Sequence, residues 1–305
     1  MKISDLSKAE LCSRLKKGKF CISVGPFSFC IDSHIEEVIE GLGDLYADYE
    51  LRDHGFADFH ISLTRPKGIR RWLHPQVLFL FDGKTPFKPL PFSQALPMME
   101  WGMNWCIANH MHHYLILHAA VVEKNGQAVI MPGNPGAGKS TLCAALVSRG
   151  WRLFSDELAL MDIDEGTLIP VTRPVSLKNE SISVIQTFSP NAHLGKSYAD
   201  TTKGTVAHMR PPKLSVEHAG HSAKPRWIIA PQYNKEISSK LDTESMAKMF
   251  MNLAENAFNY HIHGPRGFDV LGKLVEDCDC YTYTYNDLDK AIDEFEQLVQ
   301  ISSHH

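Results

Sequence analysis

Residues 133–140 constrain the fold more than any other part of the chain, because they match the phosphate-binding loop pattern G-x-x-x-x-G-K-[ST]. The apolar run at 127–131 precedes the loop and predicts a buried strand. Residues 141–149 contain few helix breakers and stop at Gly150, which predicts a helix with a glycine cap. A strand, a glycine loop and a helix in this order predict an α/β fold. The alternative is a chance glycine-rich turn, which the loop lysine, the hydroxyl and the flanking elements disfavour.

The chemistry of this loop predicts that the chain binds a nucleoside triphosphate. Glycines let the backbone wrap closely around a polyphosphate, and amides at the helix N-terminus point at its negative charge. Lys139 is expected to reach the β- and γ-phosphates, and the Ser140 hydroxyl to ligate Mg²⁺. We therefore predict ATP and Mg²⁺ as ligands. The residues predicted to bind the nucleotide are Gly133, Asn134, Pro135, Gly136, Ala137, Gly138, Lys139, Ser140 and Thr141.

Two acidic residues, Asp156 and Glu157, follow a short apolar strand predicted at 151–155. In a parallel α/β sheet, the C-terminal end of this strand would open onto the same edge as the phosphate-binding loop. One carboxylate is then placed to hold Mg²⁺, directly or through water, and the other to accept a proton from an attacking hydroxyl. Together with Ser140, these acids are the predicted metal-binding residues. The alternative is a solvated acidic turn that closes a strand.

Three further residues, His118, Arg173 and Arg210, are candidates for catalysis. His118 follows an apolar run, where a lone histidine is more often a hydrogen-bonded core residue than a catalytic one. Phosphoryl transfer needs cations around the equatorial oxygens, and each arginine stands next to a proline that restricts the backbone. Either arginine is expected to fold over the nucleotide or to hold a substrate anion, the alternative being surface charge. Lesser candidates are Lys178, Lys203 and His208.

The chain is predicted to contain two parts. Residues 1–114 alternate short strands and helices, which predicts a small N-terminal α+β domain whose last helix, at about 96–111, connects to the second part. Residues 115–305 are predicted to form the domain that carries the phosphate-binding loop. This domain is expected to begin with a hairpin at 115–131. Residues 170–225 are rich in Pro, Ser, His and Lys with weak periodicity. They predict a long irregular segment that faces the substrate or is mobile.

The composition argues against several classes of protein. The 305 residues are 44% hydrophobic and 22% charged with a net charge of −4, which gives no sign of non-specific nucleic-acid or membrane binding. No stretch approaches the ~20 apolar residues of a membrane span, and the N-terminus lacks the apolar core of a signal peptide. The seven cysteines are scattered and odd in number. We predict free thiols and a cytoplasmic location.

The combination of these residues resembles the HPr kinase/phosphorylase superfamily. Besides the loop and the two acids, the matching residues are 117–122, Gly126, 129–131, Leu146, 149–150 and 152–153. Residues 172–179 and 204–212 are similar to a divergent branch, the HPr-kinase-related kinases of the HprK-related kinase A type. The resemblance implies a P-loop kinase core related to ATP-dependent phosphoenolpyruvate carboxykinase, with chemistry on a serine hydroxyl.

The resemblance also implies roles for individual residues. By position, Asp156 matches the general base, Lys139 the phosphate-binding lysine, Ser140 the Mg²⁺ ligand and His118 an active-site histidine.

The chain departs from the parent enzymes of that superfamily at two positions. It has Glu157 where they usually carry a second aspartate, which keeps the charge, and Thr141 where they carry an acid after the loop serine. The lost carboxylate, and the lack of a clear equivalent of the glycine-rich segment linked to the reverse reaction, favour a kinase that works in one direction.

These observations predict an ATP- and Mg-dependent kinase that phosphorylates a hydroxyl, most simply a serine on a small protein or ribosomal peptide. One alternative is a kinase of a small-molecule alcohol, and another is a nucleotide-binding regulatory module without transfer chemistry. A plain ATPase is a third possibility. Related kinases often form rings or dimers, so a homo-oligomer is expected.

Overall fold

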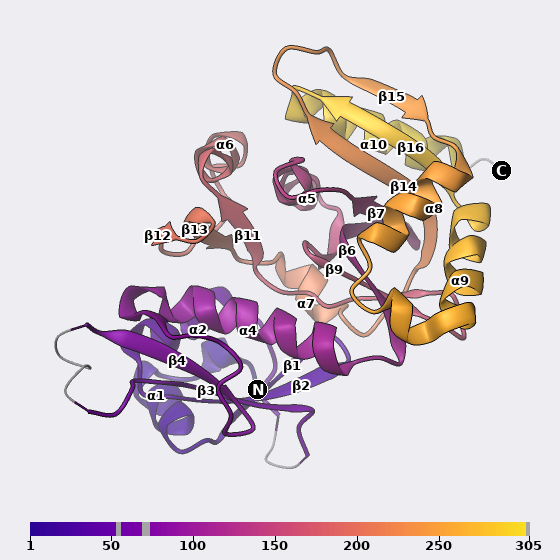
Figure 1. Cartoon of the computed structure of the whole chain (residues 1–305). Coiled ribbons are helices and arrows are strands. Elements are labelled where there is room, and N and C mark those ends of the chain that lie inside the picture. The colour runs from indigo at the N-terminus through magenta and orange to yellow at the C-terminus, as the bar shows by residue number, and fades with distance from the viewer. Residues whose placement is uncertain (53–55, 69–73, 303–305) are drawn as a thin grey trace.

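The computed structural model describes residues 1–52, 56–68 and 74–302 (Figure 1). Within these residues the chain forms a mixed α/β structure with sheets of five, eight and three strands. The five-stranded sheet belongs to the first part of the chain and the eight-stranded sheet to the second. Figure 1 shows helix α4 (Ala95–His110) running along the side of the first part that faces the second. The prediction of a mixed α/β chain is confirmed.

The first sheet has the order β1-β2-β3-β4-β5, and its strands are β1 (Phe20–Val24), β2 (Phe27–Ser33), β3 (Phe59–Thr64), β4 (Gln76–Phe81) and β5 (Leu90–Pro91). β1 and β2 form an antiparallel hairpin, and β2 pairs with β3 in parallel. Alternate residues of β3, namely Phe59, Ile61 and Leu63, are buried, because successive side chains of a strand point to opposite faces.

Helices and turns of the first part pack against this sheet: η1 (Ile3–Asp5), α1 (Lys8–Lys16), α2 (Glu36–Leu45), η2 (Phe92–Gln94) and α4. α1 begins with a capping box, in which the Ser7 hydroxyl accepts from the Glu10 amide at 3.3 Å and the Glu10 carboxylate accepts from the Ser7 amide at 2.8 Å. α4 lies close to β4, since a Cβ added at Gly102 would lie 2.1 Å from the Phe79 ring. The predicted connecting helix is confirmed.

The second sheet carries the phosphate-binding loop. Its strands are β6 (Tyr114–Lys124), β7 (Gln127–Pro132), β8 (Arg152–Ser155), β9 (Leu158–Asp162), β10 (Leu168–Ile169), β14 (Lys224–Tyr233), β15 (Lys240–Thr243) and β16 (Asp279–Tyr285). The order is β10-β9-β6-β7-β14-β16-β15, with β8 also paired to β6. β6 is antiparallel to both β7 and β8, so β7 and β8 run in the same direction. Their C-terminal ends therefore open onto one edge, as predicted.

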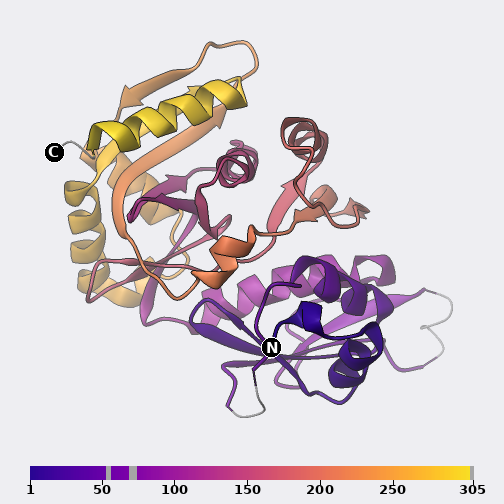
Figure 2. The same cartoon turned by 180° about the vertical axis from the view of Figure 1, so that it is seen from behind.

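Helices cover both faces of this sheet (Figure 2): α5 (Lys139–Ser148), α8 (Met246–Glu255), α9 (Tyr260–Asp277) and α10 (Leu288–Ser302). Alternation along β7 divides its side chains between them. Val129 and Met131 belong to the hydrophobic cluster that contains α5 and α10, whereas Ala128 and Ile130 belong to the cluster that contains α8 and α9. The loop after β7 is thus anchored by a strand that is buried on both faces.

The prediction of a long irregular segment at 170–225 is wrong. This stretch contains β11 (Val175–Lys178), α6 (Glu180–Phe188), β12 (Tyr198–Thr201), β13 (Gly204–Met209) and α7 (Lys213–Glu217), and its strands form a sheet in the order β11-β13-β12. The strands are too short for a clear periodicity, and β11 finds its partner β13 only after the intervening helix. The prolines lie mostly between these elements and so mark their limits.

The prediction of seven free thiols is also wrong. Cys21 and Cys30 face each other in the β1–β2 hairpin and form a disulfide, which their spacing of nine residues did not reveal. The two cysteines are directly opposed on the paired strands, with their Cα atoms 4.1 Å apart. No helix in the described part of the chain combines the length and apolarity needed to cross a membrane.

Candidate functional site

A cavity of about 1290 Å³ lies at the edge of the second sheet where β7 and β8 end. One wall is the glycine loop with the start of α5, and another is formed by the end of β11 with α6, which Figure 1 shows beside α5. Residues 285–289, between β16 and α10, line it as well. The cavity therefore joins segments that are far apart in the sequence.

The loop places most of its predicted nucleotide-binding residues on this cavity. Those that line it are Asn134, Pro135, Gly136, Gly138, Lys139, Ser140 and Thr141, while Gly133 and Ala137 do not. Gly138 precedes α5 with a φ of 92°, a left-handed conformation that favours glycine. The Tyr285 hydroxyl donates to the Gly138 carbonyl at 2.9 Å, and the Tyr233 amide donates to the Ala137 carbonyl at 3.0 Å. The ends of β14 and β16 thus hold the loop in place.

Lys139 is buried at the start of α5, with its ammonium group turned towards its own loop. The ammonium donates to the Gly133 carbonyl and, at 3.2 Å, to the Asn134 carbonyl. Burial and the positive charge of Lys178 lower the pKa of Lys139 to about 8. A polyphosphate bound beside the Lys139 ammonium would offset the free-energy cost of burying this charge.

The two acids at the end of β8 also line the cavity. The Asp156 carboxylate accepts from the Ser176 amide at 2.8 Å, yet burial and the neighbouring charge of Glu157 raise its pKa to about 7. The Ser155 hydroxyl fixes the turn by accepting from the amides of Glu157 at 3.2 Å and Leu158 at 2.9 Å. A carboxyl group that is half ionised near neutral pH is suited to accept a proton.

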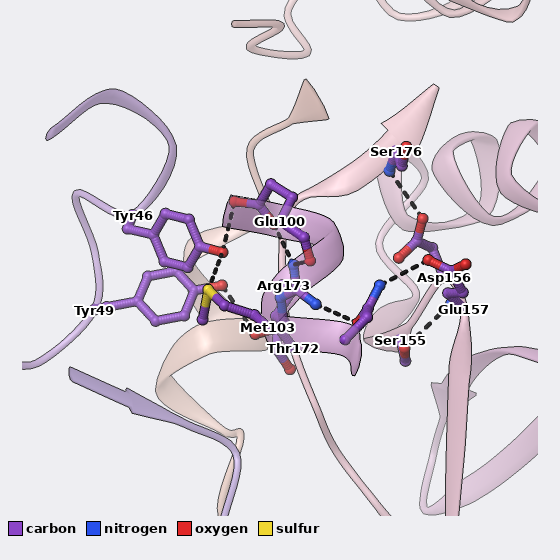
Figure 3. Close-up of polar contacts among 11 residues, drawn as sticks. Tyr46, Tyr49, Glu100, Met103, Ser155, Asp156, Glu157, Thr172, Arg173 and Ser176 are labelled. Carbon is purple, nitrogen blue, oxygen red and sulfur yellow. Dashed lines mark hydrogen bonds and ion pairs between the residues drawn. The ribbon is translucent and has the colours of Figure 1, made fainter. Parts of the chain in front are cut away.

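Glu157 is held by a chain of polar contacts that begins in the first part of the protein (Figure 3). The Asn104 side chain on α4 donates to Glu157 at 2.7 Å and accepts from Arg173. Arg173 in turn donates to the carboxylate of Glu100, which also accepts from the Tyr46 hydroxyl at 2.8 Å. We refer to Tyr46, Glu100, Asn104 and Arg173 as the support relay.

The support relay is buried at its centre. Arg173 is 5% exposed and Glu100 is 2% exposed. Burial opposes the charge on Arg173, but Glu100 more than offsets this and raises the pKa of the guanidinium. Sequence reasoning missed Asn104 and Glu100. Their spacing of four residues in an otherwise apolar helix places them on one face, and this was the available signal.

His118 lines the cavity. It is half-buried near the end of the strand pair β6–β9, and its ring packs edge-on against Phe258 with centroids 5.7 Å apart. Burial and the charge of Lys139 lower the pKa of His118, which favours the neutral ring. A neutral imidazole here can accept or donate a hydrogen bond to a bound group.

Neither predicted arginine lines the cavity, so the expectation that they contact the nucleotide or a substrate anion is wrong for this structure. Arg173 lies behind the acids in the support relay. Arg210 forms an ion pair with Asp48 at 2.6 Å and so ties the end of β13 to the first part. Two of the lesser candidates, Lys178 and Lys203, line the cavity instead, whereas His208 is buried away from it.

The predicted metal-binding residues Ser140, Asp156 and Glu157 come together on the cavity. Each carboxylate has one oxygen bonded to Ser176 or Asn104, and the other oxygen has no hydrogen bond among the described residues. The described chain contains no group of three or more His, Cys, Asp or Glu side chains that could hold a metal. Mg²⁺ commonly uses one or two carboxylates together with phosphates and water, so these residues fit it.

Comparisons with known proteins give two similarities. Residues 93–168 match the family model described as SynChlorMet cassette protein ScmC, a segment that contains all of α4, the loop and both acids. The structure of the Hpr(Ser) kinase/phosphatase from Coxiella burnetii matches with a TM-score of 0.30 and 15% identity, over 62% of this chain and 95% of that one. No curated protein matches the chain.

Proposed function

We propose that the protein is an ATP- and Mg-dependent phosphotransferase that transfers the γ-phosphoryl group to a hydroxyl. The observation that carries the proposal is the meeting of the glycine loop and the acid pair at one edge of the sheet, where both line a single cavity. A phosphate cradle without a nearby base would serve binding alone. Asp156, with a pKa of about 7 beside the loop, adds a base to that cradle.

In the proposed reaction the loop amides and Lys139 hold the β- and γ-phosphates. The acceptor oxygen attacks the γ-phosphorus while the bond from this phosphorus to the β–γ bridging oxygen breaks, releasing ADP. The acceptor proton passes to the Asp156 oxygen that is not bonded to Ser176. Ser140 and Glu157 would hold Mg²⁺, which supplies neutralisation of phosphate charge when bound.

The resemblance in the sequence supports a serine on a small protein or ribosomal peptide as the acceptor, and a P-loop kinase core beginning near residue 115. The contacts of the support relay favour a role for residues 1–114 in holding the acid pair, because Glu100 and Asn104 belong to that part. An assembly of several copies and a cytoplasmic location are part of the same proposal.

The test is transfer of label from γ-labelled ATP, in the presence of Mg²⁺, to candidate proteins and peptides. Asp156→Asn should lower transfer by ~10²–10⁴-fold, the contribution usual for a general base, while nucleotide binding persists. Lys139→Ala should weaken nucleotide binding itself. Asp164→Asn is a matched control, because that acid lies in an exposed turn and pairs with Arg266.

The outcomes separate the alternatives. Label on a serine, lost in Asp156→Asn and retained in Asp164→Asn, supports the proposal. Nucleotide binding without transfer to any hydroxyl would replace it with a regulatory module. Label found on small alcohols alone would keep the chemistry and change the acceptor.

A further inference from the structure

Two lysines, Lys178 and Lys203, line the cavity at one end of the three-stranded sheet. Lys178 is the last residue of β11, and Lys203 lies in the turn between β12 and β13. Because Lys178 pairs in register with Val206, close to the start of β13, both lysines lie at the same end of the three-stranded sheet. Both side chains line the cavity.

Neither ammonium has an anionic partner among the described residues. No ion pair or side-chain hydrogen bond joins Lys178 or Lys203 to a carboxylate, although Lys203 lies 5.4 Å from the centre of the Trp101 ring. Burial lowers the pKa of Lys178, and the positive charge of Lys203 lowers it further. Two neighbouring cations in a partly buried wall are unfavourable unless an anion lies between them.

The acids that line the cavity form no ion pair with either lysine among the described residues, although the charges of Glu157 and Asp156 act to raise the pKa of Lys178. Asp156 and Glu157 are bonded to Ser176 and Asn104. Glu180 is exposed at the start of α6, and residues 287–289 lie on the segment after β16.

A hydroxyl donor lies on the same face of β11. Ser176 stands two residues before Lys178, so their side chains point to the same side of the strand. Ser176 lines the cavity, and its hydroxyl oxygen is buried without a hydrogen-bond partner in the described structure. A buried hydroxyl usually has a partner, and here it would find one in an anion held by the two lysines.

We propose that Ser176, Lys178 and Lys203 form a second anion subsite that binds a phosphate or carboxylate group of the acceptor. This inference rests on the proposed function. The nucleotide phosphates have their own cradle in the loop, whereas the subsite belongs to a different sheet. The backbone amide of Ser176 donates to Asp156, so the base adjoins the subsite. The acceptor is therefore a hydroxyl compound or a serine peptide with an acidic group beside the hydroxyl.

The first experiment tests the subsite without turnover. The protein is saturated with Mg²⁺ and a non-hydrolysable ATP analogue, and inorganic phosphate is titrated by calorimetry. We expect one saturable site, at least tenfold weaker in Lys178→Gln/Lys203→Gln and weaker at higher salt. The matched control is Lys196→Gln/Lys213→Gln, since these exposed lysines pair with Glu37 and Glu217 outside the cavity.

The outcomes are distinct from those for the proposed function. Absence of phosphate binding to the wild type, or equal binding in both double variants, would overturn the subsite. Loss in Lys139→Ala but not in Lys178→Gln/Lys203→Gln would place the phosphate on the loop and also overturn it. The titration requires no catalysis, so an inactive protein can still pass or fail this test.

The second experiment identifies the source of the anion. Labelled ATP is offered with serine peptides that have aspartate or alanine beside the serine, and with small hydroxy acids or phosphorylated alcohols. A higher kcat/KM for acidic over neutral peptides, reduced at least tenfold in Lys178→Gln/Lys203→Gln, assigns a peptide. The same dependence on small acids alone assigns a metabolite. Equal use of neutral and acidic acceptors would contradict the subsite.

Discussion

The glycine loop and the acid pair face the same cavity but are built in different ways. The loop is one contiguous segment, held by its own glycines and by short contacts from Tyr233 and Tyr285. The acid Glu157 depends on a relay whose members come from positions 46 to 173. The glycine loop is therefore one contiguous segment, whereas the contacts that hold Glu157 are distributed over the two parts of the chain.

The largest effect should come from breaking the support relay at its centre. Glu100→Gln leaves the buried guanidinium of Arg173 without its charged partner, and loss of one member of a buried pair costs ~3–5 kcal/mol. Urea unfolding measures this loss directly. If the support relay positions Glu157 from the first part of the chain, transfer activity should fall as well. This loss should appear even at temperatures where the variant remains folded.

The control for this variant is Glu40→Gln. Glu40 forms an ion pair with Lys8, but both side chains are exposed, so its loss should change the free energy of unfolding far less. Similar destabilisation by both variants would mean that the buried pair has no special role, and the contrast between the loop and the acid pair would weaken.

The loop can be disrupted by a single methyl group. A Cβ at Gly138 would lie 2.3 Å from the Tyr285 hydroxyl oxygen, and the φ of 92° adds backbone strain of ~1–3 kcal/mol. Gly138→Ala should therefore weaken binding of the ATP analogue by roughly 5- to 150-fold, the equivalent of that strain, with little effect on Glu157. Fluorescence titration with a labelled nucleotide measures the change.

Two variants separate strain from collision in the loop. Gly136→Ala has a similar φ of 89° but meets no atom within 4 Å, so it reports strain alone. Gly138→Ala/Tyr285→Phe removes the colliding hydroxyl and should recover part of the affinity. No recovery would show that the Tyr285 contact is irrelevant to the shape of the loop.

The difference in construction explains what the sequence could and could not predict. The loop, its strand and helix, and the position of the acids after β8 were predictable because each follows from a short contiguous stretch of sequence, whereas the distant contacts that hold them were not. Arg173 was noticed for its charge but given the wrong place, since nothing local shows that Glu100 and Asn104 draw it behind the acids. The β11–β13 sheet was missed for the same reason, because its pairing is non-local.

A smaller effect is expected when Asn104 loses its two hydrogen bonds in the relay. Asn104→Leu keeps the number of side-chain heavy atoms but takes away the donor to Glu157 and the acceptor for Arg173, and loss of such a supporting partner costs about 10- to 100-fold in metal affinity or activity. We expect half-maximal transfer to require a higher Mg²⁺ concentration. The affinity for nucleotide in the absence of metal should be unchanged. Titration of activity with Mg²⁺ measures the change.

The matched control lies on the same helix. Asn109 is exposed and donates to the Trp105 carbonyl within α4, so Asn109→Leu should leave the Mg²⁺ dependence intact. Rescue by Asn104→Gln would support positioning. If Asn104→Leu instead weakened metal-free nucleotide binding, α4 would support the loop as well, and the two regions would not be independent.

The smallest effects should be shifts in protonation, and these also distinguish the two regions. The pKa of Asp156 is raised to about 7 by burial and by Glu157, and that of Lys139 is lowered to about 8 by burial and by Lys178. Activity should rise as pH passes 7, because the base must be ionised, and fall above 8, because the loop lysine then loses its charge. The rising limb reports the acid pair and the falling limb reports the loop.

Replacing Glu157 with glutamine tests whether one charge couples the two limbs. Glu157 raises the pKa of both Asp156 and Lys139, so Glu157→Gln should lower both pKa values. Carbon-13 NMR of the two side chains in the metal-free protein measures each shift without relying on catalysis. Glu180→Gln, on the exposed rim of the cavity, should move neither. A change in the pKa of Asp156 alone would show that the acid pair and the loop are electrostatically separate, although they share a cavity.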